Sequence, residues 1–120
     1  MKQNLFFIVM VIMGFSPSLL AQAPKGNIVA GKAKYDMFCA TCHGATGKGD
    51  GAAAAALNPK PRNFQDSAYM SKKSDTDLKK IIKEGGPSVG LSPMMPPWGS
   101  SLGDADINNV IAYIRTLAKK

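Results

Sequence analysis

The stretch Cys39-Ala40-Thr41-Cys42-His43 determines how this 120-residue chain can fold. Two cysteines separated by two residues and followed directly by a histidine form the attachment pattern of c-type haem. Each thiol can bond one vinyl group of the porphyrin, and the histidine then supplies a neutral imidazole nitrogen, which suits iron. Cys39 and Cys42 are the only cysteines and His43 is the only histidine, so no other residue competes for these roles. We therefore expect one covalently bound haem c, with its iron, in each chain.

Three other uses of a Cys-x-x-Cys pair fit the sequence less well. A redox-active dithiol needs a strand-to-helix setting in a βαβ pattern, and nothing in this chain reads as a parallel sheet. A zinc site needs four ligands, and two cysteines with one histidine leave it one short. A structural disulfide explains neither the adjacent His43 nor the methionines downstream. Haem attachment accounts for all of these residues together.

Length, composition and charge describe an ordinary globular chain. The 120 residues leave room for one domain and no second one. A hydrophobic content of 45% is that of a globular protein and excludes a disordered or membrane-embedded chain. The formal charge is +7, but the lysines are scattered along the chain, which argues against a nucleic-acid-binding tail. We therefore expect no nucleic-acid partner. A basic surface of this kind can instead attract an acidic protein face.

Residues 1–21 have the pattern of a secretory signal peptide. Lys2 is the lone positive charge, an apolar run follows over residues 5–13, and Ala21 offers a small residue at the cleavage site. Helix-breaking glycine and proline residues leave the apolar run well short of the ~20 residues that a membrane span needs. We expect export to the periplasm and a mature domain over residues 22–120 without a stable span. Retention of the segment as an uncleaved anchor is the alternative.

Three segments carry helix signals, and no segment reads as a convincing strand. Asn27 is a candidate N-cap for a helix over about residues 28–39, and a capping-box-like pattern starts a second helix at Ser74, which ends at Gly85. A third helix is predicted over residues 104–117 from apolar side chains at helical spacing. The apolar stripe expected on the first helix comprises Ile28, Tyr35, Met37 and Phe38. Long Gly/Pro loops between three helices pack poorly by themselves, and a large flat cofactor supplies the missing core.

A proline-rich loop follows the second helix. Residues 90–99 read GLSPMMPPWG, which suits neither helix nor strand. This stiff loop presents Met94 and Met95, and a methionine bound opposite a histidine gives haem iron a raised potential suited to electron transfer. No second histidine exists, so we expect a methionine as the sixth ligand of the iron, and of the two candidates we choose Met95.

Together these motifs resemble the soluble class I mono-haem c-type cytochromes of bacteria, in which histidine and methionine ligate the iron. The resemblance covers nearly all of the mature chain. Gly31 and Tyr35 resemble residues of the family's N-terminal helix, and Val110 and Tyr113 resemble their partners on the C-terminal helix. The run Met95-Pro96-Pro97-Trp98 is similar to the bacterial methionine loop, in which the methionine before the prolines binds iron.

This resemblance implies an all-α cytochrome c fold. Its N- and C-terminal helices would cross at right angles over the covalently bound haem, with Gly31 at their contact. A loop carbonyl from about residues 57–61 should orient the Nδ1 atom of His43. Arg62 and Trp98 are the candidates for contacts with the haem propionates.

The implied function is that of an electron-transfer protein rather than an enzyme. Filled axial positions leave the iron to exchange single electrons through the exposed porphyrin edge. Lysines around that edge would steer a monomer to acidic faces of a dehydrogenase or reductase donor and of an oxidase or reductase acceptor. The candidates for such a docking patch, which could also be a merely solvated face, are Lys72, Lys73, Lys79, Lys80 and Lys83. Two alternatives stay open: a five-coordinate haem that binds gas or reduces peroxide, and a haem subunit of a larger oxidoreductase.

Overall fold

The computed structural model describes residues 26–118, and within this range it contains helices and no strand. The expected signal peptide, residues 1–21, lies outside the described residues. The elements are α1 (Ile28–Phe38), α2 (Ala40–His43), η1 (Ala54–Ala56), α3 (Ser67–Ser71), α4 (Asp75–Glu84), η2 (Gly86–Val89) and α5 (Asp104–Leu117). None of the helices in the described part is long and apolar enough to cross a membrane. The expected all-α class is confirmed.

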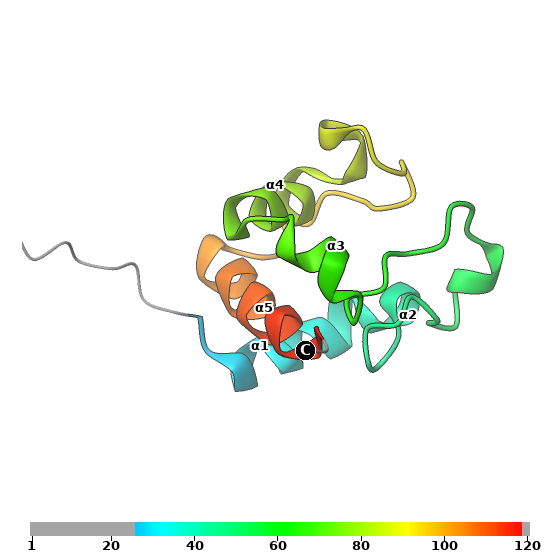
Figure 1. The fold of residues 1–120 in the computed structure, drawn as a ribbon. Helices are drawn as coiled ribbons and strands as arrows, with labels where there is room; N and C mark the ends of the chain where they lie inside the picture. Colours follow the sequence, from blue (N-terminus) through cyan, green and yellow to red (C-terminus); the bar gives the residue numbers. More distant parts are fainter. Residues whose placement is uncertain (1–25, 119–120) are drawn as a thin grey trace, which may run out of the picture.

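Helices α1 and α5, from the two ends of the described chain, lie across each other (Figure 1). Their backbones meet at Gly31, where an added Cβ would overlap the carbonyl of Asn109 and stand 3.0 Å from the amide nitrogen of Val110. Beside this contact the rings of Tyr35 and Tyr113 pack edge to face, with centroids 5.1 Å apart. The helix pair and the glycine at its contact are therefore confirmed.

Side-chain caps begin two of the helices where the sequence predicts them. The Asn27 side chain accepts a hydrogen bond from the Ala30 N–H at 3.0 Å, which caps α1. Ser74 and Asp77 form a complete capping box at the start of α4, because each side chain accepts a hydrogen bond from the other residue's backbone N–H. The short helices α2 and α3 were not predicted, since four or five residues are too few to carry a periodic pattern.

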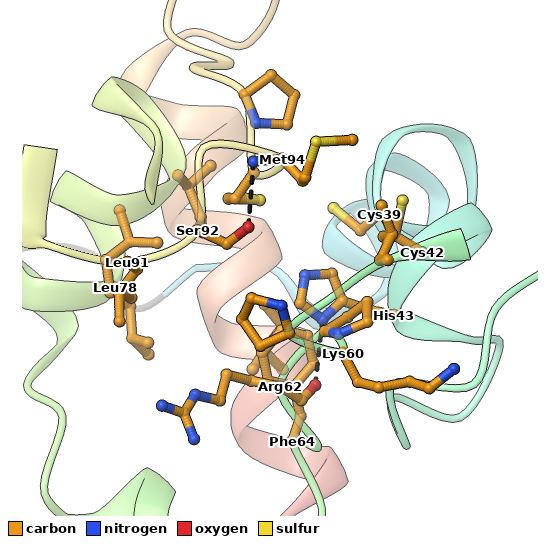
Figure 2. Close-up of a pocket in the computed structure, with 18 of the residues that line it drawn as sticks. Cys39, Cys42, His43, Lys60, Arg62, Phe64, Leu78, Leu91, Ser92 and Met94 are labelled. Carbon is orange, nitrogen blue, oxygen red and sulfur yellow. Dashed lines mark hydrogen bonds between the residues drawn. The ribbon is translucent and has the colours of Figure 1, made fainter. Parts of the chain in front are cut away.

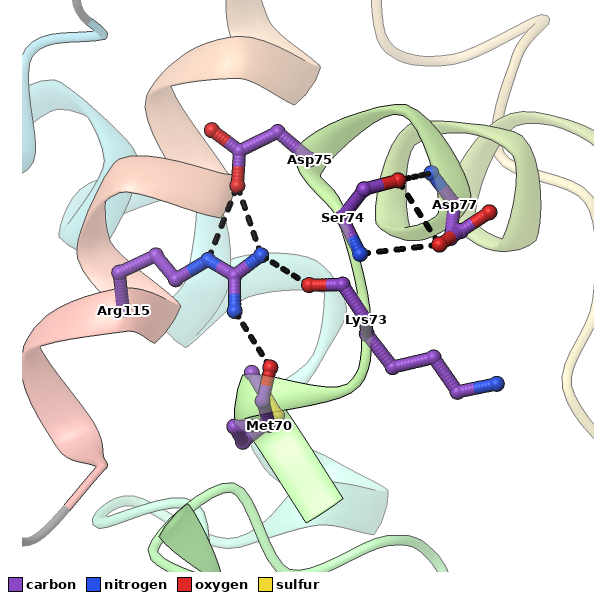
Figure 3. Close-up of polar contacts among 6 residues, drawn as sticks. All are labelled: Met70, Lys73, Ser74, Asp75, Asp77 and Arg115. Carbon is purple, nitrogen blue, oxygen red and sulfur yellow. Dashed lines mark hydrogen bonds and ion pairs between the residues drawn. The ribbon is translucent and has the colours of Figure 1, made fainter. Parts of the chain in front are cut away.

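Arg115 connects α5 to the junction between α3 and α4 (Figure 3). Its Nη1 donates to the carbonyl oxygen of Met70 at 2.8 Å, and its Nη2 donates to that of Lys73. Its Nε donates to the Asp75 carboxylate at 2.9 Å. One guanidinium therefore satisfies two carbonyls at the end of α3 and pairs with the first residue of α4.

The core joins the inner faces of α1, α4 and α5. Its buried side chains include Tyr35, Leu78, Ile82, Ile107, Val110, Ile111 and Ile114. The apolar stripe predicted for α1 is wrong at two positions, because Ile28 and Met37 are 49% and 69% exposed. The face that α1 buries against α5 is instead the row Gly31, Tyr35, Cys39, whose members lie four residues apart.

Candidate haem-binding site

A cavity of about 530 Å³ opens between α2, α4, the segment after η1 and the loop of residues 90–99, which we call the methionine loop (Figure 2). The six residues expected to hold the haem all line this cavity: Cys39, Cys42, His43, Arg62, Met95 and Trp98. Most of the remaining wall is aliphatic or aromatic, and Lys60 and Arg62 are the only lining residues with a permanent charge. The structure thus brings the predicted residues of three distant segments to one apolar space.

The single turn of α2 places both cysteines on one wall of the cavity. Cys39 closes α1, and its carbonyl accepts hydrogen bonds from the N–H groups of Cys42 and His43 at 3.2 and 2.9 Å. Both cysteines are free thiols, and they lie close to each other beside His43 (Figure 2). Burial, with a smaller contribution from nearby Cys42, raises the pKa of the Cys39 thiol to about 12. An uncharged sulfur therefore suits this wall better than a thiolate.

His43 is held as a neutral imidazole. Its Nδ1 lies 3.2 Å from the carbonyl oxygen of Arg62, and because a carbonyl only accepts, the proton of the hydrogen bond belongs to Nδ1. Burial lowers the pKa of His43, and the hydrogen bond to Arg62 opposes that shift. One face of the ring stacks on Phe64, with centroids 4.4 Å apart and planes inclined by 17°. Nε2 is left with the lone pair that a metal requires.

The carbonyl that orients His43 was expected from residues 57–61, and this expectation is wrong by one residue. The acceptor is the carbonyl of Arg62. The physical reason is an anchor further along the chain, where the Phe64 N–H donates to the carbonyl of Gly47 at 2.6 Å. That bond draws the segment toward the loop that follows His43 and sets residue 62 beside the ring.

The methionine loop contributes two thioethers to the cavity wall. Met95 is half-buried against the core, and both of its backbone groups are engaged, since its N–H donates to Ser92 at 3.2 Å and its carbonyl accepts from Gly86 at 2.9 Å. Met94 is 57% exposed, and its N–H donates to the Ser92 side chain at 3.1 Å. Met95 is therefore the more firmly positioned of the two.

The two candidates for propionate contacts also face the cavity. The Arg62 guanidinium lies over the Tyr69 ring, with 4.6 Å from Cζ to the ring centroid. The Trp98 ring packs edge to face on Phe38 at 5.4 Å, and its backbone N–H donates to Ile82 at 2.9 Å. Both side chains are thus held by aromatic neighbours at the wall of the cavity.

These donors match what covalent haem requires. Two thiols one helical turn apart and a neutral imidazole share one wall, and two thioethers line the same apolar space. The family model described as cytochrome c matches residues 28–118 of the chain. The chain belongs to the cytochrome c family. Its cofactor is therefore covalently bound haem c with its iron, and it is a mono-haem protein because it contains a single Cys-x-x-Cys-His motif.

Known proteins resemble this cytochrome c over most of its length. Cytochrome c-554(547) of Halothiobacillus neapolitanus is 34% identical over 92 residues, which make up 77% of this chain and 98% of that protein. The solved structure of the KustC0563 c-type cytochrome has a TM-score of 0.61 and 27% identity, and the match covers 74% of this chain and 98% of that one. A structure titled Kuenenia stuttgartiensis reducing HAO-like protein complex Kustc0457/Kustc0458 has a TM-score of 0.63 and 28% identity, with 81% of this chain and 45% of that chain covered. This cytochrome c is thus similar both to a single-domain c-type cytochrome and to part of a chain in a larger complex.

The five lysines considered as a docking patch differ in their surroundings. Lys79 and Lys83 both pair with Asp104, at 3.1 and 3.0 Å. Lys72 and Lys80 are exposed and form no ion pair with any residue in the range 26–118. The cytochrome therefore holds part of this positive charge in local pairs and leaves part of it to solvent.

Sequence reasoning missed two aromatic residues of the site. Phe64 stacks on His43, and Tyr69 supports the Arg62 side chain. Both follow the segment of residues 58–61, Asn-Pro-Lys-Pro, and no periodic pattern there marks which side chains turn inward. Only the packing of this segment against the loop after His43 reveals their places.

Proposed function

We propose that this cytochrome c is an exported carrier that passes single electrons between protein partners, with haem held by Cys39, Cys42, His43 and Met95. The observation that carries the proposal is the meeting of the neutral His43 imidazole and the anchored Met95 thioether at one apolar cavity. Bound haem supplies the chemistry, which is the gain or loss of one electron at the iron.

Each of these residues has a separate task in the proposal. Cys39 and Cys42 would bond the two vinyl groups, and a thioether, like the neutral thiol that burial favours, places no charge at the buried Cys39 position. His43 ligates the iron through Nε2, while the Arg62 carbonyl keeps the proton on Nδ1 and fixes the tautomer. Met95 would ligate the iron through its thioether and would exclude small molecules from it.

The wall of the cavity completes the binding of the cofactor. Its aliphatic and aromatic side chains keep water from most of the porphyrin. Arg62 and Trp98 offer the hydrogen-bond donors with which the propionates would interact at the wall. With the iron ligated by His43 and Met95 in this proposal, no substrate can bind to it, and only electrons pass between the protein and its partners.

The sequence supports export and acidic partners as parts of the proposal. Residues 1–21 are proposed as the signal peptide, so that residues 22–120 form a monomeric periplasmic domain. The formal charge of +7 falls to +6 when Lys2 is removed, and this positive surface would favour acidic docking faces on a donor and an acceptor.

A second candidate is a haem subunit that a larger oxidoreductase holds permanently. The likeness to part of a chain in the reducing HAO-like protein complex favours it. Gel filtration of native extract separates the two functions, because the free carrier elutes as a monomer and the subunit elutes with its enzyme.

Carbon monoxide tests the ligand set. Optical spectra of the oxidised, the reduced and the carbon-monoxide-treated reduced holoprotein should show no carbon monoxide binding for the wild type, because Met95 occupies the sixth position. Met95→Ala should bind carbon monoxide promptly, whereas Met94→Ala, the matched control from the same loop, should behave as the wild type. Prompt binding by the wild type would overturn the carrier function and favour a five-coordinate haem that binds gas or reduces peroxide.

A further inference from the structure

Phe64 stacks on His43, and this is the only stacked pair of aromatic rings in residues 26–118. The two rings are nearly parallel, at 17°, with centroids 4.4 Å apart (Figure 2). The remaining aromatic pairs in this range are edge to face, such as Tyr35 with Phe64 at 6.4 Å and 66°. Phe64 therefore lies face to face with the imidazole in an offset stack, rather than meeting it edge on.

The hydrogen bond on His43 leaves the plane of the ring incompletely fixed. Its donor–acceptor distance is 3.2 Å, the long end of the range for N–H···O bonds, where the restoring force on the direction of Nδ1 is weakest. A small swing of the ring would keep this bond within range of the Arg62 carbonyl. The same swing would drive the ring into the flat face of Phe64, because repulsion rises steeply at closer approach.

Phe64 itself has little freedom to yield. Its side chain is 9% exposed, and its backbone N–H donates to the carbonyl of Gly47 at 2.6 Å. A Cβ built on Gly47 would lie 3.3 Å from two Phe64 side-chain atoms, so the backbone presses close to the ring on that side. Tyr35, which is fully buried and donates to the carbonyl of Gly44 at 2.7 Å, packs against another edge. The Phe64 ring is thus held in place between the loop after His43 and the cavity.

We propose that Phe64 is a positioning residue that sets the plane of the His43 imidazole at the iron. The inference rests on the proposed function, in which His43 is a ligand. The Arg62 carbonyl fixes the tautomer, and Phe64 fixes the rotation of the ring about its bond to the metal. In the oxidised holoprotein this rotation, together with the orientation of the sixth ligand, would set the relative energies of the iron orbitals that share the unpaired electron. The plane of His43 would therefore influence how spin is spread over the porphyrin.

Proton NMR and electron paramagnetic resonance of the oxidised holoprotein test the proposal. Phe64→Leu removes the flat face and keeps an apolar side chain, so the spacing of the haem-methyl resonances and the g-values should both shift. Phe64→Tyr keeps the ring and should restore the wild-type pattern. Phe38→Leu is the matched control, because Phe38 lines the same cavity but packs on Trp98 and has no stacking contact with His43.

Unchanged haem-methyl spacing and g-values in Phe64→Leu would overturn the positioning role. Should Phe64→Leu fail to take up haem, the reduced wild type decides, because stacking at 4.4 Å requires nuclear Overhauser contacts between the two rings. Their absence would contradict the proposal. Failure of the proposed ligand set would be seen separately, as carbon monoxide binding by the wild type, in which Phe64 is unchanged.

Discussion

The α-carbon of Gly31 lies directly against the carbonyl group of Asn109, so that α1 and α5 touch backbone to backbone. No side-chain rotation can make room there, because the atom that an added Cβ would overlap belongs to the main chain. Gly31→Ala should therefore destabilise the holoprotein by about 1–3 kcal/mol through overpacking, which exceeds the gain in helix propensity of about 0.5–1 kcal/mol. Denaturant unfolding followed by circular dichroism measures the loss.

Gly103 provides the control for this substitution. It precedes α5 as the N-cap, a Cβ there meets nothing within 4 Å, and its φ of −68° is open to any residue. Gly103→Ser should keep the wild-type stability or raise it slightly, because serine is a preferred N-cap residue. An equal loss of unfolding free energy in Gly31→Ala and Gly103→Ser would mean that the contact between α1 and α5 does not require glycine at position 31.

Arg115 should matter more to stability than its acidic partner. Arg115→Gln removes two charge-assisted hydrogen bonds to the part-buried carbonyls of Met70 and Lys73, and a hydrogen bond to a charged group contributes about 1.5–3 kcal/mol. Asp75→Asn removes only the charge of a carboxylate that is 73% exposed, and a pair of this kind contributes about 0–1 kcal/mol. Urea unfolding of the two holoproteins compares them. A larger loss in Asp75→Asn would show that the ion pair, and not the carbonyl contacts, holds the junction.

Local sequence signals were enough to predict the three long helices. Asn27 and Ser74 are capping residues whose chemistry acts within three positions of the chain, so the helix starts that they predict are observed. The same holds for α5, whose buried isoleucines recur at helical spacing. The mistaken burial of Met37 has the opposite cause, because which face of α1 is covered depends on α5, seventy residues away in the chain.

The predicted cofactor residues meet at one cavity because each comes from a motif with its own chemistry. Cys39, Cys42 and His43 are adjacent in sequence, and Met95 is the methionine before a pair of prolines. The contacts that surround His43 could not be predicted from residue spacing. They depend on how the segment ending at Phe64 docks on the loop after His43, a long-range pairing that no periodic pattern encodes.

The capping box of α4 should make part of the stability depend on pH. Hydrogen bonds from the side chain and the backbone of Ser74 hold the pKa of Asp77 below its ordinary value of 3.8. A carboxyl group whose pKa is lower in the folded state stabilises it fully above the unfolded pKa and loses this effect as the pH falls through the folded pKa. The difference in unfolding free energy between wild type and Asp77→Ala should therefore be constant above about pH 5 and shrink below about pH 3.8.

Ser74→Ala supplies the matched background for that measurement. With the Ser74 hydroxyl gone, only the backbone N–H of residue 74 still donates to the Asp77 carboxylate, so the Asp77→Ala substitution should have a smaller and flatter effect across the same pH range, as a double-mutant cycle would reveal. A difference between wild type and Asp77→Ala that stays constant down to pH 2.5 would contradict the capping role of the carboxylate.

Electrostatic steering should be local to the lysines that lack partners. Lys80 is exposed on α4 next to Ile81, which lines the cavity, whereas Lys32 on α1 is paired with Asp36. Lys80→Gln and Lys32→Gln remove the same net charge. Only Lys80→Gln should reduce a small anionic oxidant more slowly than the wild type does, by roughly a few-fold at low salt. The reason is that the electric field of a surface charge is screened within about 10 Å, so that only charges near the cavity act there.

Stopped-flow rates with an anionic and a cationic oxidant, measured from low to high ionic strength, decide the matter. The anionic rates should fall steeply with salt and the cationic rates should rise, because screening removes attraction in the first case and repulsion in the second. Equal slowing by Lys80→Gln and Lys32→Gln would assign the steering to the net charge of the chain rather than to this face. Salt-independent rates with both oxidants would show that the basic surface does not guide the reaction, and the acidic docking faces proposed for the partners would lose their support.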